Sequence, residues 1–254
     1  MARRTPEGPP PAPVVQRVRV RYAKRGRLRF TSHRDFARAF ERALRRAEVP
    51  MAYSAGFTPH PKISYVGASP TGVASEAEYL EIGLASMVDI ERLRADLDAA
   101  LPAGLDVVEA VPAGPGTLAD RMQGALWRIE LPGVPEQAAR LAVDAFLART
   151  EVTVERLTKS GRRAVDIRSP ILRLDVSGAA STGPDAGRAI LEVVVRQVTP
   201  AVRPDDIVAA LHAVAGLAPV APPVAVRLAQ GPLDEHAAVG DPLATDRAHA
   251  TTTT

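Results

Sequence analysis

The chain has 254 residues, which is enough for one large or two small hydrophobic cores, and it contains no cysteine. The lack of thiols excludes disulfides, zinc–thiolate sites, iron–sulfur clusters and cysteine nucleophiles within the chain. The net charge of +3 hides an asymmetry: residues 1–65 carry 15 Lys and Arg against four acids, a net of +11, whereas the remaining residues carry 17 against 25, a net of −8. This basic front and acidic back indicate a polyanionic partner for the front.

No apolar run approaches the length of about 18 to 20 residues that a membrane-spanning helix requires. The first ten residues are basic and proline-rich, with no apolar segment behind them, which does not match a secretory signal. We therefore expect a cytoplasmic protein without a membrane partner. Residues 1–13 are predicted to be disordered because they are rich in proline and poor in apolar side chains.

The first predicted element is a strand in which apolar and basic residues alternate. The apolar set is Val18, Val20 and Tyr22, and the basic set is Arg17, Arg19 and Arg21. This alternation predicts a half-buried strand with an arginine-lined outer face. A turn at residues 24–26 follows, and the alternation then continues through Leu28 and Phe30.

A helix is predicted from Ser32 to about Glu48. Ser32 is a suitable N-cap with Asp35 three residues later, and Pro50 stops the helix. The apolar stripe consists of Phe36, Phe40, Leu44 and Ala47, and a separate stripe consists of Arg34, Arg38, Arg42 and Arg45. Neighbouring cations at helical spacing repel one another, so the basic stripe is not required for local stability.

The next segments complete a β-α-β-β-α-β order. They are a short strand at 51–54, a loop at 56–61, a strand at 62–66, a flexible stretch at 67–75, a strand at 78–84, a helix from about 89 to 101, and a strand at 105–111. This order is typical of the split βαβ of ferredoxin-like domains. The first domain is therefore predicted over residues 14–112.

A Gly- and Pro-rich linker is predicted at 113–124, and a second domain at 125–230 repeats the order of the first with one extra hairpin. Residues 231–254, which end in four threonines, are predicted to be a disordered tail. The fold class that follows is α+β, with two tandem ferredoxin-like domains.

Residues 17–84 carry motifs that match a known family: residues 28–35, 42–47 and 52–64, then Gly72 and residues 75–79. With these motifs the chain resembles the radical-SAM-linked domain family, the bacterial domain of unknown function 2344, in its stand-alone form. The resemblance implies a partner that is a radical-SAM enzyme or ribonuclease E/G. Because the chain has no cysteine, any radical chemistry would belong to that partner.

The candidate RNA-binding residues combine cationic side chains with a loop aromatic. Guanidinium groups pair bidentately with phosphate, and RNA readers stack unpaired bases on aromatic rings. All four tyrosines and four of the five phenylalanines lie in residues 22–79, and Phe57, in a loop beside Gly56, is the best candidate for an exposed ring. The predicted set is Arg19, Arg21, Lys24, Arg27, Arg29, Ser32, Arg34, Arg38, Arg42, Arg45, Phe57 and Lys62. The alternative is a solvated basic face without a ligand.

Two histidines, His33 and His60, are candidate catalytic residues, because a histidine pair beside cations can cleave RNA by acid–base chemistry without a metal. The alternative for each is a capping or packing role. Glu76, Glu78 and Glu81 lack the spacing of metal ligands, and Glu76 and Glu78 are expected to pair with nearby arginines. No metal or other cofactor is predicted.

The function that these patterns favour is a non-enzymatic RNA-binding accessory module. It would present a structured RNA, such as tRNA or rRNA, to a partner radical-SAM enzyme or ribonuclease. One alternative is a metal-free endoribonuclease that uses His33 and His60, and another is a subunit that docks an acidic protein. We further expect six residues to converge on one concave surface: Ser32, His33, Arg34, Phe57, His60 and Lys62.

Overall fold

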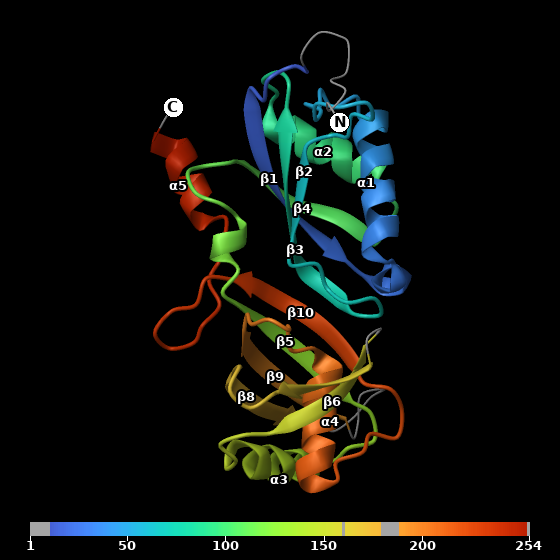
Figure 1. Cartoon of the computed structure of the whole chain (residues 1–254), viewed down its shortest axis with the longest axis vertical. Coiled ribbons are helices and arrows are strands. Elements are labelled where there is room, and N and C mark those ends of the chain that lie inside the picture. The colour runs from blue at the N-terminus through green and yellow to red at the C-terminus, as the bar shows by residue number, and fades with distance from the viewer. Residues whose placement is uncertain (1–10, 159–160, 179–187, 253–254) are drawn as a thin grey trace, which may run out of the picture. The chain divides into compact units, whose positions relative to one another are not determined.

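The computed structural model describes residues 11–158, 161–178 and 188–252, so most of the predicted disordered N-terminus lies outside the described residues. The chain forms two compact units (Figure 1). Unit 1 contains residues 1–120 together with 242–254, and unit 2 contains residues 121–241. Unit 1 is therefore made of two segments that are far apart in the sequence.

Unit 1 is built on an antiparallel sheet with strand order β4-β1-β3-β2. Its elements follow one another as strand, helix, strand, strand, helix, strand, with a short 3-10 helix η1 after the first strand. They are β1 Gln16–Lys24, η1 Gly26–Phe30, α1 His33–Arg46, β2 Ile63–Val66, β3 Ala74–Leu84, α2 Ile90–Ala100 and β4 Leu105–Pro112.

Helix α1 begins and packs as its sequence predicts. The Ser32 hydroxyl accepts a hydrogen bond from the Asp35 backbone N–H at 3.2 Å, which caps the first turn. The apolar stripe faces the sheet, and Phe36 and Phe40 are buried. The Phe36 ring stacks on Tyr22 of β1 with ring centroids 4.2 Å apart. These contacts fix α1 on the inner face of the sheet and leave its opposite face to solvent.

The outer face of the unit 1 sheet is partly covered by two further segments. The chain after β4 runs along it, and helix α5, Ala244–Thr252, lies on the other side of the sheet from α1 (Figure 1). Leu243 is fully buried, and Arg247 forms an ion pair with Glu109 of β4 at 2.5 Å. The prediction of a disordered tail is wrong over the helix, because ion pairs and a buried leucine hold a segment whose composition alone does not suggest packing.

The segment after β1 also differs from the alternating pattern predicted for it. Residues 26–30 form η1, in which the Leu28 N–H donates to the Arg25 carbonyl at 3.0 Å. Gly26 adopts a φ of +54°, which glycine reaches without the steric cost that a side chain adds. The chain therefore turns at once, and Phe30 is left 58% exposed.

Unit 2 repeats this element order with an added hairpin. Its sheet has the order β10-β5-β9-β8, and β6 and β7 pair separately with each other. A short 3-10 helix η2, Ala119–Arg121, precedes it in the chain. The elements are β5 Gly124–Leu131, α3 Glu136–Leu147, β6 Thr153–Thr158, β7 Gly161–Asp166, β8 Ile171–Gly178, β9 Ala189–Arg196, α4 Pro204–Ala215 and β10 Val224–Gly231.

The chain is thus an α+β protein, as predicted, with helices that follow strands in both units. In α4 the first turn contains Pro204, Asp205 and Asp206, and the Asp206 carboxylate accepts a hydrogen bond from the Arg203 backbone N–H at 2.7 Å. Within the described ranges, no helix combines the length and apolar character needed to cross a membrane.

Candidate functional site

Arg19 of β1 lies inside unit 1 and is only 1% exposed. Its Nε–H donates to Glu81 of β3 at 2.9 Å, and its Nη1–H donates to Asp246 of α5 at 2.7 Å. A third bond runs from Nη2 to the Gly116 carbonyl at 2.5 Å. Every nitrogen of this guanidinium group is therefore used within the protein.

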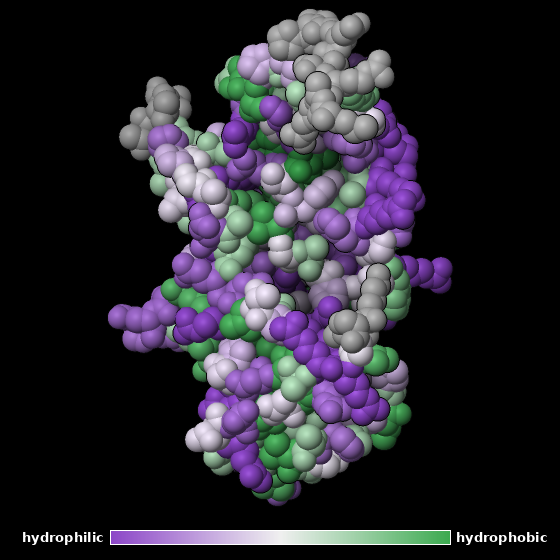
Figure 2. Space-filling model, viewed as in Figure 1, coloured by the Kyte–Doolittle hydropathy of each residue, from purple (hydrophilic) through white to green (hydrophobic). Residues whose placement is uncertain are grey.

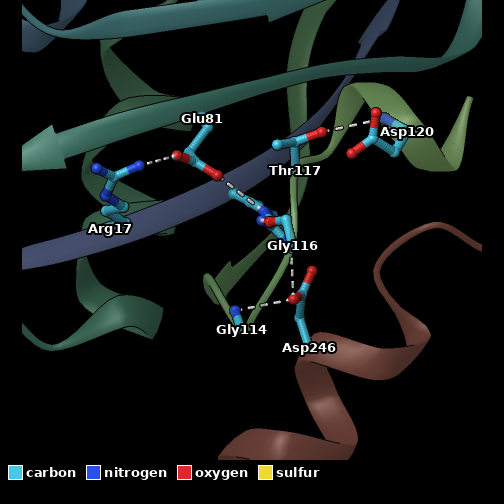
Figure 3. A network of polar contacts seen from close by, with 8 residues as sticks. Arg17, Glu81, Gly114, Gly116, Thr117, Asp120 and Asp246 are labelled. Atoms are coloured by element: carbon cyan, nitrogen blue, oxygen red, sulfur yellow. Dashed lines mark hydrogen bonds and ion pairs between the residues drawn. The ribbon is translucent and has the colours of Figure 1, made fainter.

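Asp246 is held by the linker as well as by Arg19 (Figure 3). The Gly114 N–H donates to the same Asp246 oxygen at 2.9 Å, and a Cβ at Gly114 would come within 2.9 Å of that oxygen. A glycine at this position is thus the residue that lets the carboxylate approach the backbone. The prediction that Arg19 contacts RNA is wrong, because its charge is buried and neutralised by two acids.

Lys24 is also buried, at 4% exposure, and its Nζ donates to the Pro70 carbonyl at 3.2 Å. The prediction that it contacts RNA is therefore wrong as well, because the 67–75 loop closes over the ammonium group. Arg21 is half-buried, and its Nε–H donates to the backbone carbonyl of Glu76 at 2.8 Å.

Arg25 forms ion pairs with Glu76 and, at 2.7 Å, with Asp106. The hydrogen bond to Glu76 is the main cause that raises the pKa of Arg25 above its ordinary value. The expectation that Glu76 pairs with an arginine is confirmed. Glu78 accepts a hydrogen bond from the Ser69 N–H at 3.0 Å. Arg19, Arg21 and Arg25 are thus all used in contacts within unit 1.

Six other arginines of the predicted RNA-binding set differ from Arg19 and Arg21. They lie on η1 and α1, and in the described part of the chain none has an ion pair or a side-chain hydrogen bond. Five are exposed and one, Arg29, is half-buried. The set is Arg27, Arg29, Arg34, Arg38, Arg42 and Arg45, and we call it the α1 basic face. Figure 2 shows hydrophilic side chains gathered over α1.

The α1 basic face has an aromatic neighbour in Phe30. The guanidinium carbon of Arg29 lies 4.8 Å from the centre of the Phe30 ring, which is a cation–π contact. The Gly72 N–H donates to the Arg29 carbonyl at 2.8 Å, and this bond fixes the 67–75 loop beside η1. An exposed ring beside unpaired guanidinium groups can bind a ligand that has both phosphates and planar bases.

His33 and Ser32 lie at the start of α1. The Ser32 hydroxyl donates to the Asp35 carboxylate at 2.6 Å, in addition to its capping bond, so this side chain has a structural role. His33 is exposed, and its ring meets the edge of Tyr65 of β2 with centroids 4.9 Å apart. Tyr65 also packs against Phe36, which places this contact on the inner, helix-bearing side of the sheet.

His60 and Lys62 line a depression of about 420 Å³ on the outer side of the same sheet. Its further polar lining comes from Arg17, Ser54, Ser64 and Glu81. The loop above it is closed at its base, because the Ser54 N–H donates to the His60 carbonyl at 2.9 Å and the His60 N–H donates to Ser54 Oγ at 3.1 Å. Phe57 lies in this loop and is 73% exposed.

A second depression, of about 520 Å³, adjoins the first and shares Arg17, Ser64 and Glu81 with it. Its other wall is the linker after β4, including Gly114, Gly116 and Thr117. The outer face of the sheet therefore carries a trough made of these two adjoining depressions. Arg17, Ser54 and Ser64 belong to it and were not in the predicted set, although the alternation along β1 already places Arg17 on this face.

The predicted convergence of six residues on one concave surface is not found. His60 and Lys62 share the outer depression, whereas His33 packs against Tyr65 on the inner side. The pairing of His33 with His60 therefore has no geometric support. Within the described residues, no group of three or more His, Asp or Glu side chains is arranged to hold a metal ion.

Comparison with known proteins identifies the family of this chain. A search of curated proteins found no significant match. Among solved structures, the crystal structure of an unknown protein from Galdieria sulphuraria aligns at 14% identity over 78% of this chain and 91% of that chain, with a TM-score of 0.25. That overlap is too low to bear on fold or function. The family described as uncharacterized protein conserved in bacteria (DUF2344) matches residues 17–204, and the chain belongs to this family.

Proposed function

We propose that the chain is an RNA-binding module and that its α1 basic face contacts RNA phosphates. The observation that carries this proposal is the set of six arginines on η1 and α1 that has no acidic partner within the described residues. Exposed guanidinium groups at helical spacing gain nothing from one another, because like charges on one face repel. A polyanion that bridges them removes this repulsion and releases condensed counterions.

We also infer that each unit is a ferredoxin-like domain. The support is the antiparallel order β4-β1-β3-β2 in unit 1 and the equivalent order β10-β5-β9-β8 in unit 2. Related RNA-binding sheets stack bases on strand aromatics of the open face. In unit 1, α5 and the linker cover part of that face, and Tyr79 of β3 is buried. The helix face therefore offers the larger exposed cationic surface.

The proposed role is accessory, with a structured RNA such as tRNA or rRNA presented to a partner enzyme. A radical-SAM enzyme or a ribonuclease is the partner class that the sequence resemblance implies. The geometry favours binding over cleavage by this chain, because His33 and His60 lie on different sides of the unit 1 sheet. Binding without cleavage leaves the chemistry to the partner.

The experiment is a salt titration of binding to cellular RNA, with the wild type compared with the double variant Arg38→Gln/Arg42→Gln. Each phosphate contact contributes roughly −0.7 to the slope of log K against log salt for a single strand, so four to six contacts predict a slope of about −3 to −4. The double variant should lose about one unit of slope or slightly more. Its affinity should fall similarly across RNA sequences, because phosphate contacts position the RNA without specifying it.

The matched control is Arg92→Gln/Arg149→Gln, which removes the same charge from two exposed arginines outside the α1 basic face. Its slope and affinity should stay close to those of the wild type. No binding to any cellular RNA at low salt, or an equal loss in both double variants, would contradict the proposal. In that case a basic surface for an acidic protein partner becomes the better explanation of the unpaired arginines.

A further inference from the structure

The depression beneath the 54–60 loop is lined by more basic than acidic side chains. Its lining contains Arg17, Lys62 and His60, with Glu81 as the acid. That carboxylate is already bonded by Arg17 at 3.2 Å and by the buried Arg19 at 2.9 Å. Arg19 is also paired with Asp246 at 2.7 Å, so Arg17, Lys62 and Glu81 leave the lining with a net charge of about +1 before His60 is counted.

The donors of this depression still have capacity to bind. Arg17 uses one nitrogen on Glu81, and its side chain is 64% exposed. Among the described residues, the side chains of Lys62, His60 and Ser64 make no hydrogen bond or ion pair. Four side chains that can donate hydrogen bonds thus line one hollow without a shared acceptor.

We propose that this depression binds a phosphomonoester, the phosphate group at the end of an RNA or on a free nucleotide. A terminal phosphate carries close to two negative charges at neutral pH and presents three free oxygens to the unshared donors of the lining, whereas an internal phosphodiester carries one charge and presents two. The Arg17 guanidinium group offers a fork to two phosphate oxygens, and Lys62 offers a point charge to the third.

The rim of the depression fits the rest of a nucleotide. Ser54 and His60 line the hollow and also close the base of the loop that contains Phe57. A ring that is 73% exposed on this loop is a platform on which a base can stack while its phosphate lies below. The volume of about 420 Å³ is within the range typical of small-ligand sites.

If the ligand is the terminal phosphate of an RNA, the inference rests on the proposed function and makes it more specific. If the ligand is a free nucleotide, the inference is independent of the proposed function. The two sources are separated by binding measurements on the full chain. One arm uses three RNA oligonucleotides of the same sequence, with a 5′-phosphate, a 3′-phosphate or no terminal phosphate. The other arm compares AMP with adenosine by calorimetry.

We expect one of the phosphorylated ends to bind roughly tenfold tighter than the unphosphorylated oligonucleotide, because hydrogen bonds between charged groups are stronger than those between neutral ones. Lys62→Gln and Arg17→Gln should each bring this ratio close to one. Arg38→Gln/Arg42→Gln should weaken all three oligonucleotides together and leave the ratio unchanged. Arg92→Gln, on the exposed side of α2, is the control for a lost charge.

The outcomes separate the two proposals. If the oligonucleotides bind with equal affinity and AMP binds no better than adenosine, the phosphomonoester site is refuted even though RNA binding stands. If no RNA binds but AMP is preferred over adenosine in a manner that requires Lys62, the proposed function fails and the site holds a free nucleotide. A preference that survives in both Lys62→Gln and Arg17→Gln places phosphate recognition elsewhere and also refutes the site.

Discussion

The arginines of β1 and those of α1 come from the same basic front of the chain, yet the fold uses them in opposite ways. Arg19 is buried and bonded to Glu81 and Asp246, and Arg25, the residue directly after β1, is paired with Glu76 and Asp106. In contrast, the α1 basic face has no such partner in the described part of the chain. A count of charges along the sequence therefore overstates the surface available to a polyanion.

The difference follows from what lies opposite each element. A strand inside a sheet has neighbours on both sides, and Arg19 of β1 is paired with Glu81 of β3 and, across the outer face, with Asp246 of α5. Burial alone lowers the pKa of Arg19, but hydrogen bonds to Asp246 and Glu81 outweigh it and leave the pKa raised. The outward face of α1 meets only solvent. Paired cations thus serve stability, and unpaired cations are left for a ligand.

The largest effect is expected for Arg19→Gln. Removal of one partner from a buried ion pair leaves the other charge uncompensated, which costs roughly 3 to 5 kcal/mol of the free energy of unfolding. Urea denaturation measures this loss. Asp246→Asn should destabilise unit 1 in the same direction, and the double variant should lose less than the sum, because the two residues are in contact.

The exposed Arg17→Gln on the same strand is the control for this prediction. Its ion pair with Glu81 lies at a side chain that is 64% exposed, and such pairs contribute about 0 to 1 kcal/mol. An equal loss of unfolding free energy in Arg17→Gln and Arg19→Gln would contradict the proposed difference between buried and surface arginines on β1.

A second prediction separates stacking from charge. Phe57→Ala should weaken RNA binding by about 1 to 3 kcal/mol per stacked base and leave the salt slope unchanged, because no phosphate contact is lost. The salt titration used for the α1 basic face measures both quantities. Leu157→Ala, at a side chain that is 80% exposed in unit 2, should leave the affinity unaltered. A changed slope in Phe57→Ala would show that the ring acts by positioning cations.

A third prediction concerns the start of α1. Ser32→Ala removes the bond that the hydroxyl accepts from the Asp35 N–H, and loss of such a cap costs about 1 kcal/mol. Urea denaturation should show this loss, and Ser32→Thr should restore most of it. If Ser32→Ala instead reduced RNA affinity without a loss of stability, the hydroxyl would be a ligand contact, as the sequence pattern had suggested.

The smallest effect on the free energy of unfolding is expected for the double variant of the α1 basic face, although its effect on RNA binding is expected to be large. Arg38→Gln/Arg42→Gln should change the free energy of unfolding by less than about 0.5 kcal/mol, with a tendency to stabilise, because two like charges four residues apart are removed. Urea denaturation beside the Arg19→Gln measurement makes the comparison direct. A loss above about 2 kcal/mol would mean that these arginines hold the fold.

Local patterns predicted much of unit 1. The stripe of Phe36 and Phe40 correctly indicated the buried side of α1, and Ser32 correctly indicated where the helix begins. Both signals lie within a few helical turns, so the interactions that determine them are between residues close in the sequence. The alternation along β1 likewise indicated which residues share a face.

The same alternation could not show what covers that face. The acid that neutralises Arg19 is Asp246, which is 227 positions away in a segment with the composition of a tail. The separation of His33 from His60 was also not predictable, because it depends on which side of β2 each loop reaches. A φ of +54° at Gly26 turned the expected alternation into η1. The first two misses reflect tertiary contacts that sequence spacing does not encode, whereas the third reflects a local backbone conformation at one glycine.

The discontinuity of unit 1 has a consequence during synthesis. Arg19 emerges from the ribosome early, whereas its partner Asp246 is made only after every residue of unit 2. Domains generally fold in order as the chain emerges, so the inner core of unit 1 can form while its buried guanidinium group still lacks one carboxylate. Nascent unit 1 is therefore expected to be less stable than the finished unit, and α5 supplies the last of its ion pairs after the rest of the chain has been made.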